Sequence, residues 1–259
     1  MSKYEQDILN TVNLRGRVSV VELAAILQVS DQTVRRIVKP MVRDGRLTKV
    51  HGALVSTQNV LDPPFMARMT RNRAAKVAIA NAVAARIPDG SAIAIDTGST
   101  SGFIAQALRG RRELTVVTNS AFIAATLAME EGNRVFMAGT QLRNHDGAAF
   151  DRAAYEVIAS LSVQTAVLSA SLVHPTRGFM VFDQCEADMA AAMKGIAERI
   201  FMAVDSTKFN EAATSAALRL PALGRTDLIF TDRPPPPAYR AMPGEAELVI
   251  AQDGGGAGT

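Results

Sequence analysis

From residue 71 onward, short apolar segments alternate with helical segments, and this alternation limits the possible folds more than any other feature of the chain. Clear examples are SAIAID (91–96) followed by GFIAQAL (102–108), and LTVVTN (114–119) followed by AFIAATLAM (121–129). Further strands are predicted at RVFMAG, TAVLSAS, FMAVD, DLIFT and LVIA, and further helices at 71–86 and 186–200. The pattern predicts an α/β fold with a mostly parallel sheet covered on both faces.

The first 57 residues have a different pattern, with three short helices followed by a small hairpin. Ser19 and Glu22 have the spacing of a capping box, and Ser30 is a candidate N-cap for a helix over residues 31–43. RLTKV and ALVS read as two strands that turn near His51 and Gly52. This order is typical of a winged helix-turn-helix, which places its last helix in the DNA major groove.

The third helix of this head is predicted to have one buried face and one basic face. Val34, Val38 and Met41 are spaced by four and three residues and should point inward. Pro40 should bend the helix near its end and leave the forward turn intact. The opposite face carries Gln32, Arg36, Lys39 and Arg43, and Arg35 flanks Arg36.

Charge is distributed unevenly along the chain. Residues 1–76 contain 13 Lys and Arg against 6 Asp and Glu, whereas the remainder has 15 against 19. A basic head on a mildly acidic body favours a polyanionic partner such as double-stranded DNA, although small helical domains are often basic without one. We expect Gln32, Arg35 and Arg36 to reach base edges. The full set expected at DNA is Ser30, Gln32, Thr33, Arg35, Arg36, Lys39, Arg43, Arg46, Lys49 and His51.

Length and composition predict the domain organisation. With 259 residues, 48% of them hydrophobic, the chain suits two globular domains. We expect a DNA-binding domain over 1–57, a linker over 58–70, an α/β domain over 71–252 and a disordered tail over 253–259. A single cysteine, no apolar leader and no long apolar run predict a cytoplasmic protein without a membrane partner.

Three loops that follow strands carry small polar residues: DTGSTS (96–101), TNS (118–120) and DSTKF (205–209). In parallel sheets such loops meet at one edge, where ligands bind. Gly98 allows close backbone approach, and free N–H groups at a helix start suit a phosphate. Each loop alone is typical of helix capping, but together with Lys208 they favour a small anionic ligand. The expected ligand residues are Asp96, Thr97, Gly98, Ser99, Thr100, Ser101, Thr118, Asn119, Ser120, Asp205 and Lys208.

Several of these motifs resemble, in order and spacing, those of the DeoR-type bacterial transcriptional regulators. At the head the resemblance is carried by GRVSVVELAAILQVSDQTVRRIVKPMVRDGRLTKVHGALV, and in the body by AIAIDTGSTS, LTVVTNS, VFMAGTQLR, DSTKF and DLIFTD. The resemblance implies a sensor domain similar to sugar-phosphate isomerases and CoA transferases. It also implies a repressor of sugar or polyol catabolism genes that is released by a phosphorylated sugar or polyol, and a homo-oligomer (dimer or tetramer).

The chain departs from the family pattern at four places. Ile37 replaces the usual aspartate after the arginine pair, and Ala53 replaces a glycine of the hairpin turn. Leu172-Val173-His174 stands where a Gly-Ile-Asp segment is expected, and Asp151 stands where a glycine is usual. The last two positions are expected near the ligand edge, so the chemical class of the effector stays open.

Two alternatives to a sugar-phosphate-responsive repressor remain. One is an isomerase or CoA-transferase-like enzyme, for which only Asp96, Asp205 and Lys208 offer acid–base groups. The other is an activator, or a sensor of an unphosphorylated ligand. The spacing of the three histidines and Cys185 matches no metal-site pattern. We therefore expect no metal, no cofactor and no catalytic residue.

Overall fold

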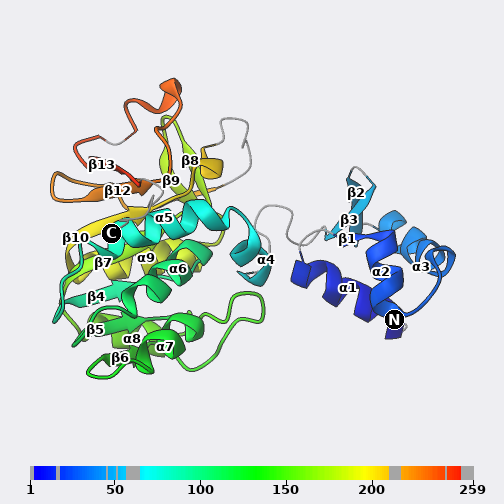
Figure 1. The fold of residues 1–259 in the computed structure, drawn as a ribbon, viewed down its shortest axis with the longest axis horizontal. Coiled ribbons are helices and arrows are strands. Elements are labelled where there is room, and N and C mark those ends of the chain that lie inside the picture. The colour runs from blue at the N-terminus through cyan, green and yellow to red at the C-terminus, as the bar shows by residue number, and fades with distance from the viewer. Residues whose placement is uncertain are drawn as a thin grey trace, which may run out of the picture. The chain divides into compact units, whose positions relative to one another are not determined.

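The computed structural model describes residues 3–15, 18–44, 46–50, 52–56, 65–209, 217–242 and 244–251. By its internal contacts the chain divides into two compact units, Met1–Arg71 and Asn72–Thr259 (Figure 1). His51 and the predicted tail of residues 253–259 lie outside the described residues. Among the described helices, none combines the length and the apolarity that crossing a bilayer requires.

The first unit has the predicted three helices and hairpin, with one additional strand. Ser19 and Glu22 form the predicted capping box, and the Thr33 amide donates to the Ser30 hydroxyl at 3.2 Å. Gly52 takes a φ of 82° at the hairpin turn, a conformation that glycine adopts readily. The elements are α1 (Lys3–Arg15), β1 (Val18–Ser19), α2 (Val20–Leu27), α3 (Asp31–Arg43), β2 (Leu47–Val50), β3 (Ala53–Ser56) and α4 (Phe65–Thr70).

The hairpin is part of a three-stranded sheet, because β1 pairs antiparallel with β3. A two-residue strand was not predicted, since it is too short to show a sequence period. The core of this unit contains Ile8, Leu23, Val34, Met41 and Leu54, all buried. The segment directly before α2 therefore contacts the hairpin as well as the helices.

Part of the segment predicted as a linker, residues 58–70, is helical. Residues 65–70 form α4, in which Phe65 and Ala67 are buried. The prolines at 63 and 64 favoured a linker throughout this segment. By its internal contacts the first unit extends to Arg71.

The second unit is built on a seven-stranded sheet in the order β13-β12-β10-β7-β4-β5-β6, and every pair is parallel. The helices α5, α6 and α7 pack against one another as one layer, and α8 and α9 form the other (Figure 1). This confirms the predicted α/β fold. The strands are β4 (Ala92–Ile95), β5 (Thr115–Thr118), β6 (Arg134–Met137), β7 (Val163–Ser169), β10 (Ala197–Ala203), β12 (Leu228–Thr231) and β13 (Glu247–Ile250). The helices are α5 (Arg73–Ala84), α6 (Ser99–Leu108), α7 (Ala121–Ala128), α8 (Arg152–Ala159) and α9 (Gln184–Gly195).

A small antiparallel sheet and two short 3-10 helices complete this unit. The sheet has the order β11-β9-β8, made by Leu218–Arg219, Gly178–Val181 and Leu172–His174. The 3-10 helices are η1 (Ser206–Lys208) and η2 (Pro237–Tyr239). None of these elements was predicted, because each is too short to show a period.

One predicted boundary is wrong. The helix expected over residues 186–200 ends at Gly195, and β10 begins at Ala197. Residues 197–200 place two charged side chains between Ala197 and Ile200, and apolar residues three apart fit a helix. Pairing of Ala197 with Val163 of β7 decides for the strand.

Candidate functional sites

The third helix of the first unit, α3, has the two faces that the sequence predicted. Val34, Val38 and Met41 are buried in the core of this unit. The helix continues through Pro40 to Arg43. Because the apolar side is buried, the polar side is the one available to a partner.

The polar face of α3 is a row of solvent-exposed side chains. Gln32, Arg35, Arg36 and Lys39 are all exposed, and within the described residues none of the three cations forms an ion pair. An open concavity of about 480 Å³ follows this face. It is lined by Ser30, Gln32, Thr33, Arg35, Arg36 and Lys39. Unpaired cations along one helix face are the arrangement that phosphate and base-edge contacts require.

The other cations near this row differ in whether they form an ion pair within the described residues. Arg43 pairs with its neighbour Asp44 at 3.1 Å, and Arg46 pairs with Glu5 of α1 at 3.6 Å. Lys49 is exposed on β2. These cations are arranged around α3, but Arg46 has an acidic partner within the protein that the sequence did not reveal.

In the second unit, the strand order brings the predicted loops to one edge of the sheet. The loops after β4 and β5 are neighbours, whereas β7 lies between β4 and β10. The strands β5 and β6, which follow β4 in the chain, extend the sheet on one side of β4. The later strands, beginning with β7, extend it on the other side. The carboxyl ends of strands at such a switch point are where α/β proteins bind ligands.

Asp96 is a half-buried acid at this switch point. The Ser169 amide, at the end of β7, donates to Asp96 Oδ2 at 2.7 Å, and the Ser101 hydroxyl donates to Oδ1. Burial raises the pKa of Asp96 to about 7, the hydrogen bonds from Ser101 and Ser169 oppose the rise, and the negative charge of Glu186 adds to it. The sequence reasoning missed Ser169, because only the sheet order places β7 beside β4.

Gly98 precedes α6 and lies against Ser169. A Cβ atom at Gly98 would lie 2.4 Å from the Ser169 hydroxyl, so any other residue here would force that hydroxyl to rotate. The next three residues, Ser99, Thr100 and Ser101, are buried and form the first turn of α6. Their backbone N–H groups are the donors that a helix start leaves without intrahelical acceptors.

Three buried polar atoms near this helix start have no hydrogen-bond partner among the described residues. They are Thr97 Oγ1, Asn119 Oδ1 and Ser120 Oγ. The Asn119 side chain is held in place because its Nδ2 donates to the Ala149 carbonyl at 3.0 Å. Thr118 has a structural role, since its hydroxyl accepts from the Ser120 amide. Buried polar atoms without partners are rare in proteins and are typical of ligand sites.

The third predicted loop, residues 205–209, forms hydrogen bonds to the start of α5. Asp205 is buried, and its Oδ1 accepts hydrogen bonds from Thr207 and from Asn72, just before α5. Its Oδ2 is another buried atom without a hydrogen-bond partner. Lys208 lies in η1 and is partly exposed. The predicted grouping of Asp205 with Asp96 is therefore weakened, because the hydrogen bonds of Asp205 go to the start of α5.

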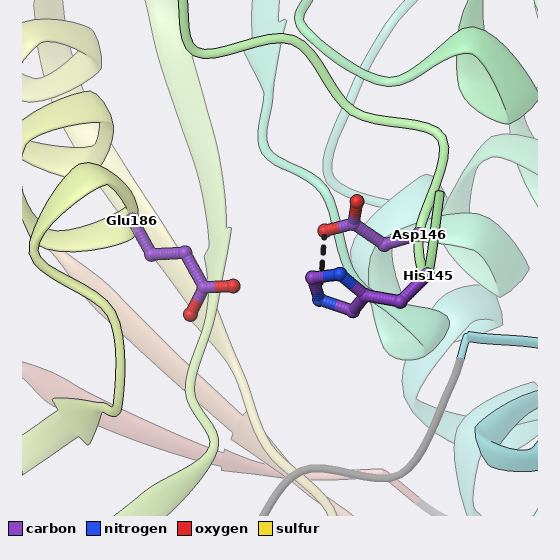
Figure 2. Close-up of side chains that lie close together, drawn as sticks. All are labelled: His145, Asp146 and Glu186. Carbon is purple, nitrogen blue, oxygen red and sulfur yellow. Dashed lines mark ion pairs between the residues drawn. The ribbon is translucent and has the colours of Figure 1, made fainter. Parts of the chain in front are cut away.

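A cluster of possible metal ligands lies beside the start of α9. His145, Asp146 and Glu186 offer ligand atoms within 4.8 Å of one another, and their side chains point into a common space (Figure 2). The guanidinium of Arg143 donates to Asp146 and, at 2.9 Å, to Glu186. A cationic side chain therefore already compensates these carboxylates, so the cluster does not require a metal ion.

Two of the family departures have structural roles. The Asp151 carboxylate caps α8 through the Ala154 amide and accepts three further bonds, from the Thr140 amide and hydroxyl and from the Gln141 amide. These bonds lower its pKa to about 2. His174 Nδ1 lies 3.2 Å from the Thr176 amide, which donates to it in the turn between β8 and β9. The observed hydrogen bonds of Asp151 and His174 lie within the protein and do not assign either side chain to a ligand.

Comparison with known proteins assigns both units. The family described as the DeoR C terminal sensor domain matches residues 71–233, and the DeoR-like helix-turn-helix domain matches residues 5–60. The chain belongs to the DeoR family. The HTH-type transcriptional repressor CsqR of Escherichia coli (strain K12) is 32% identical to this DeoR-family protein, over 95% of this chain and 94% of its own.

A second relative is the glycerol-3-phosphate regulon repressor of Escherichia coli (strain K12), 29% identical over 88% of this chain and 90% of its own. This DeoR-family protein is accordingly a DNA-binding transcriptional regulator. Among solved structures, ribose 5-phosphate isomerase A from Neisseria gonorrhoeae is similar over 56% of this chain and 57% of its own, with 18% identity and a TM-score of 0.41. Similarity at that level carries no conclusion about activity.

Proposed function

We propose that this DeoR-family regulator represses genes of sugar or polyol catabolism by binding operator DNA through α3. The observation that carries the proposal is the exposed row of Gln32, Arg35, Arg36 and Lys39 on the side of α3 opposite its buried face. Arginine reads guanine and glutamine reads adenine by bidentate hydrogen bonds in the major groove. Lys39, Arg43 and Lys49 would neutralise phosphates on either side.

The effector is a phosphorylated sugar or polyol that binds at the carboxyl edge of the sheet. Its phosphate would accept from the N–H groups of Ser99, Thr100 and Ser101 at the start of α6. Its hydroxyl groups would pair with the buried atoms Asn119 Oδ1 and Ser120 Oγ. A protonated Asp96 would spare the phosphate the repulsion of a nearby carboxylate.

Release of DNA follows if the effector binds one arrangement of the regulator better than the arrangement that fits the operator. Two half-sites on DNA require paired copies of the helix-turn-helix, so the working form would be a homodimer or homotetramer. The relatives named above are repressors, which supports this direction of regulation. Transcription in vitro from an operator-bearing promoter would distinguish a repressor from an activator.

The effector class can be tested with matched pairs of compounds. We expect glycerol 3-phosphate or a hexose 6-phosphate to raise the melting temperature and to release DNA in a gel shift, because a ligand stabilises the state that it binds. Glycerol and the unphosphorylated hexose are the controls. Equal shifts with the phosphorylated and unphosphorylated members of each pair would contradict the assignment of a phosphate subsite to α6.

Asp96 should make stability depend on pH in a defined direction. The folded chain keeps a proton on Asp96 up to about pH 7, whereas the unfolded chain releases it near the usual aspartate pKa of 3.8. The free energy of unfolding should therefore contain a component that falls as the pH rises from 4 to 7. In urea unfolding across this range, the unchanged protein should lose stability relative to Asp96→Asn as the pH rises. Parallel curves would show that Asp96 titrates normally.

An enzymatic function has less support. The sheet does not pair Asp96 with Asp205 in a common hydrogen-bond network among the described residues. Burial raises the pKa of the Cys185 thiol, which disfavours the reactive thiolate. Turnover of ribose 5-phosphate that is lost in Asp205→Asn would restore the isomerase alternative.

A further inference from the structure

Arg143 links two segments that are far apart in the sequence. Its guanidinium donates to Asp146 in its own loop, between β6 and α8. It also donates to Asp183 at 3.1 Å and to Glu186 at 2.9 Å, at the start of α9. The same group stacks on the ring of Phe150, 4.1 Å from its centre. One side chain thus joins the β6–α8 loop to α9.

The loop that carries Arg143 also supports the ligand residue Asn119. The Arg143 amide donates to the Ala148 carbonyl at 2.8 Å, and Ala148 forms a bridge with Ser120. The next residue, Ala149, donates its amide to the Asn119 carbonyl and accepts from Asn119 Nδ2. A displacement of this loop would therefore move both unpartnered atoms, Asn119 Oδ1 and Ser120 Oγ.

The other end of the link influences Asp96. Glu186 is the charged residue whose field contributes to the raised pKa of Asp96, after the larger effect of burial. Arg143 donates a charge-assisted bond to that same carboxylate. Loss of the guanidinium would remove a positive charge that offsets the negative charge of Glu186, which acts on Asp96.

We propose that Arg143 is a positioning residue of the effector site, which holds the β6–α8 loop and the start of α9 together so that Asn119 and Asp96 face one ligand. The proposal rests on the proposed function for the identity of the site. It deepens that function by naming a residue that acts through Glu186 and the loop, without needing its own contact with the effector.

Titration of Asp96 tests this role without any ligand. Carboxyl ¹³C NMR of aspartate-labelled protein reports the midpoint of Asp96, whose signal is assigned by its absence in Asp96→Asn. We expect Arg143→Gln to raise the midpoint by about half a pH unit or more, because Glu186 loses its compensating charge. Arg143→Lys should stay near the original value, and Glu186→Gln should lower it. Arg152→Gln is the matched control, since Arg152 is exposed and pairs with Glu156 in its own helix.

Hydrogen exchange supplies a second measurement on the same variants. The amides of residues 147–149 should exchange about tenfold faster in Arg143→Gln and near the original rate in Arg143→Lys. If Arg143→Gln does not fold, the Lys and Glu186→Gln variants still decide the question. An unchanged Asp96 midpoint in Glu186→Gln, or in folded Arg143→Gln, would overturn the proposal.

Binding of glycerol 3-phosphate separates this inference from the proposed function. If the unchanged protein binds it, Arg143→Gln should weaken the binding about tenfold while Arg152→Gln leaves it unaltered. Equal affinity in both variants would overturn the positioning role. If the unchanged protein binds none of the phosphorylated compounds, the phosphate-effector proposal fails, and the titration and exchange results still decide the role of Arg143.

Discussion

Charge reversal by Arg36→Glu is expected to lower operator affinity at least about a hundredfold, with no loss of folded structure. Arg36 is exposed on α3, and within the described residues it has no ion pair whose loss would destabilise the fold. The substitution removes a base or phosphate contact and adds a negative charge against DNA. Loss of a bidentate base contact alone costs about 1–3 kcal/mol, and repulsion adds to it.

The measurement is a gel shift on DNA selected from a random pool with the unchanged protein, at two salt concentrations because such affinities depend on salt. Arg152→Glu is the control, since Arg152 is an exposed arginine of α8 in the second unit. Circular dichroism and the melting temperature verify the fold of both variants. Operator affinity that survives Arg36→Glu would reject α3 as the recognition helix.

The second large effect is expected at Gly98. In Gly98→Ala the added methyl group would lie 2.4 Å from the Ser169 hydroxyl, which must then rotate away from its position beside Asp96. This change alters the wall of the proposed phosphate site at the start of α6. We expect the affinity for the effector to fall at least about tenfold. The variant should therefore still bind DNA but should not be released from it by the effector.

Gly195→Ala is the matched control for this prediction. A Cβ atom at Gly195 meets no atom within 4 Å, so the same chemical change there introduces no contact. The two variants are compared by thermal shift with the phosphorylated compounds and by release of DNA from the operator. Normal release in Gly98→Ala would show that the effector binds away from this strand end.

The sequence predicted the long periodic elements well, because each shows enough residues for its period to be recognised. It predicted the faces of α3 and the capping of Ser19 and Ser30, since these depend on neighbours a few residues away. It did not separate α9 from β10, because the apolar spacing of residues 197–200 fits a helix. That boundary depends on pairing with β7, which is distant in the sequence.

The candidate ligand site was predicted only in part. The loops after β4 and β5 carried a recognisable pattern of small polar residues, and the sheet order makes them neighbours. Ser169, Arg143 and Glu186 gave no local signal, because their roles depend on contacts between segments that are distant in the chain. Asp205 was grouped with Asp96 by its place after a strand, whereas its hydrogen bonds go to Asn72.

The contact between Arg46 and Glu5 affects how DNA binding should be interpreted thermodynamically. The guanidinium of Arg46 lies 3.6 Å from the carboxylate of Glu5, so an anion already lies beside it in the protein without DNA. If Arg46 binds a phosphate, as the sequence predicts, it would exchange one anionic partner for another. The net number of ions released into the solvent would then be smaller than the number of basic side chains at the interface.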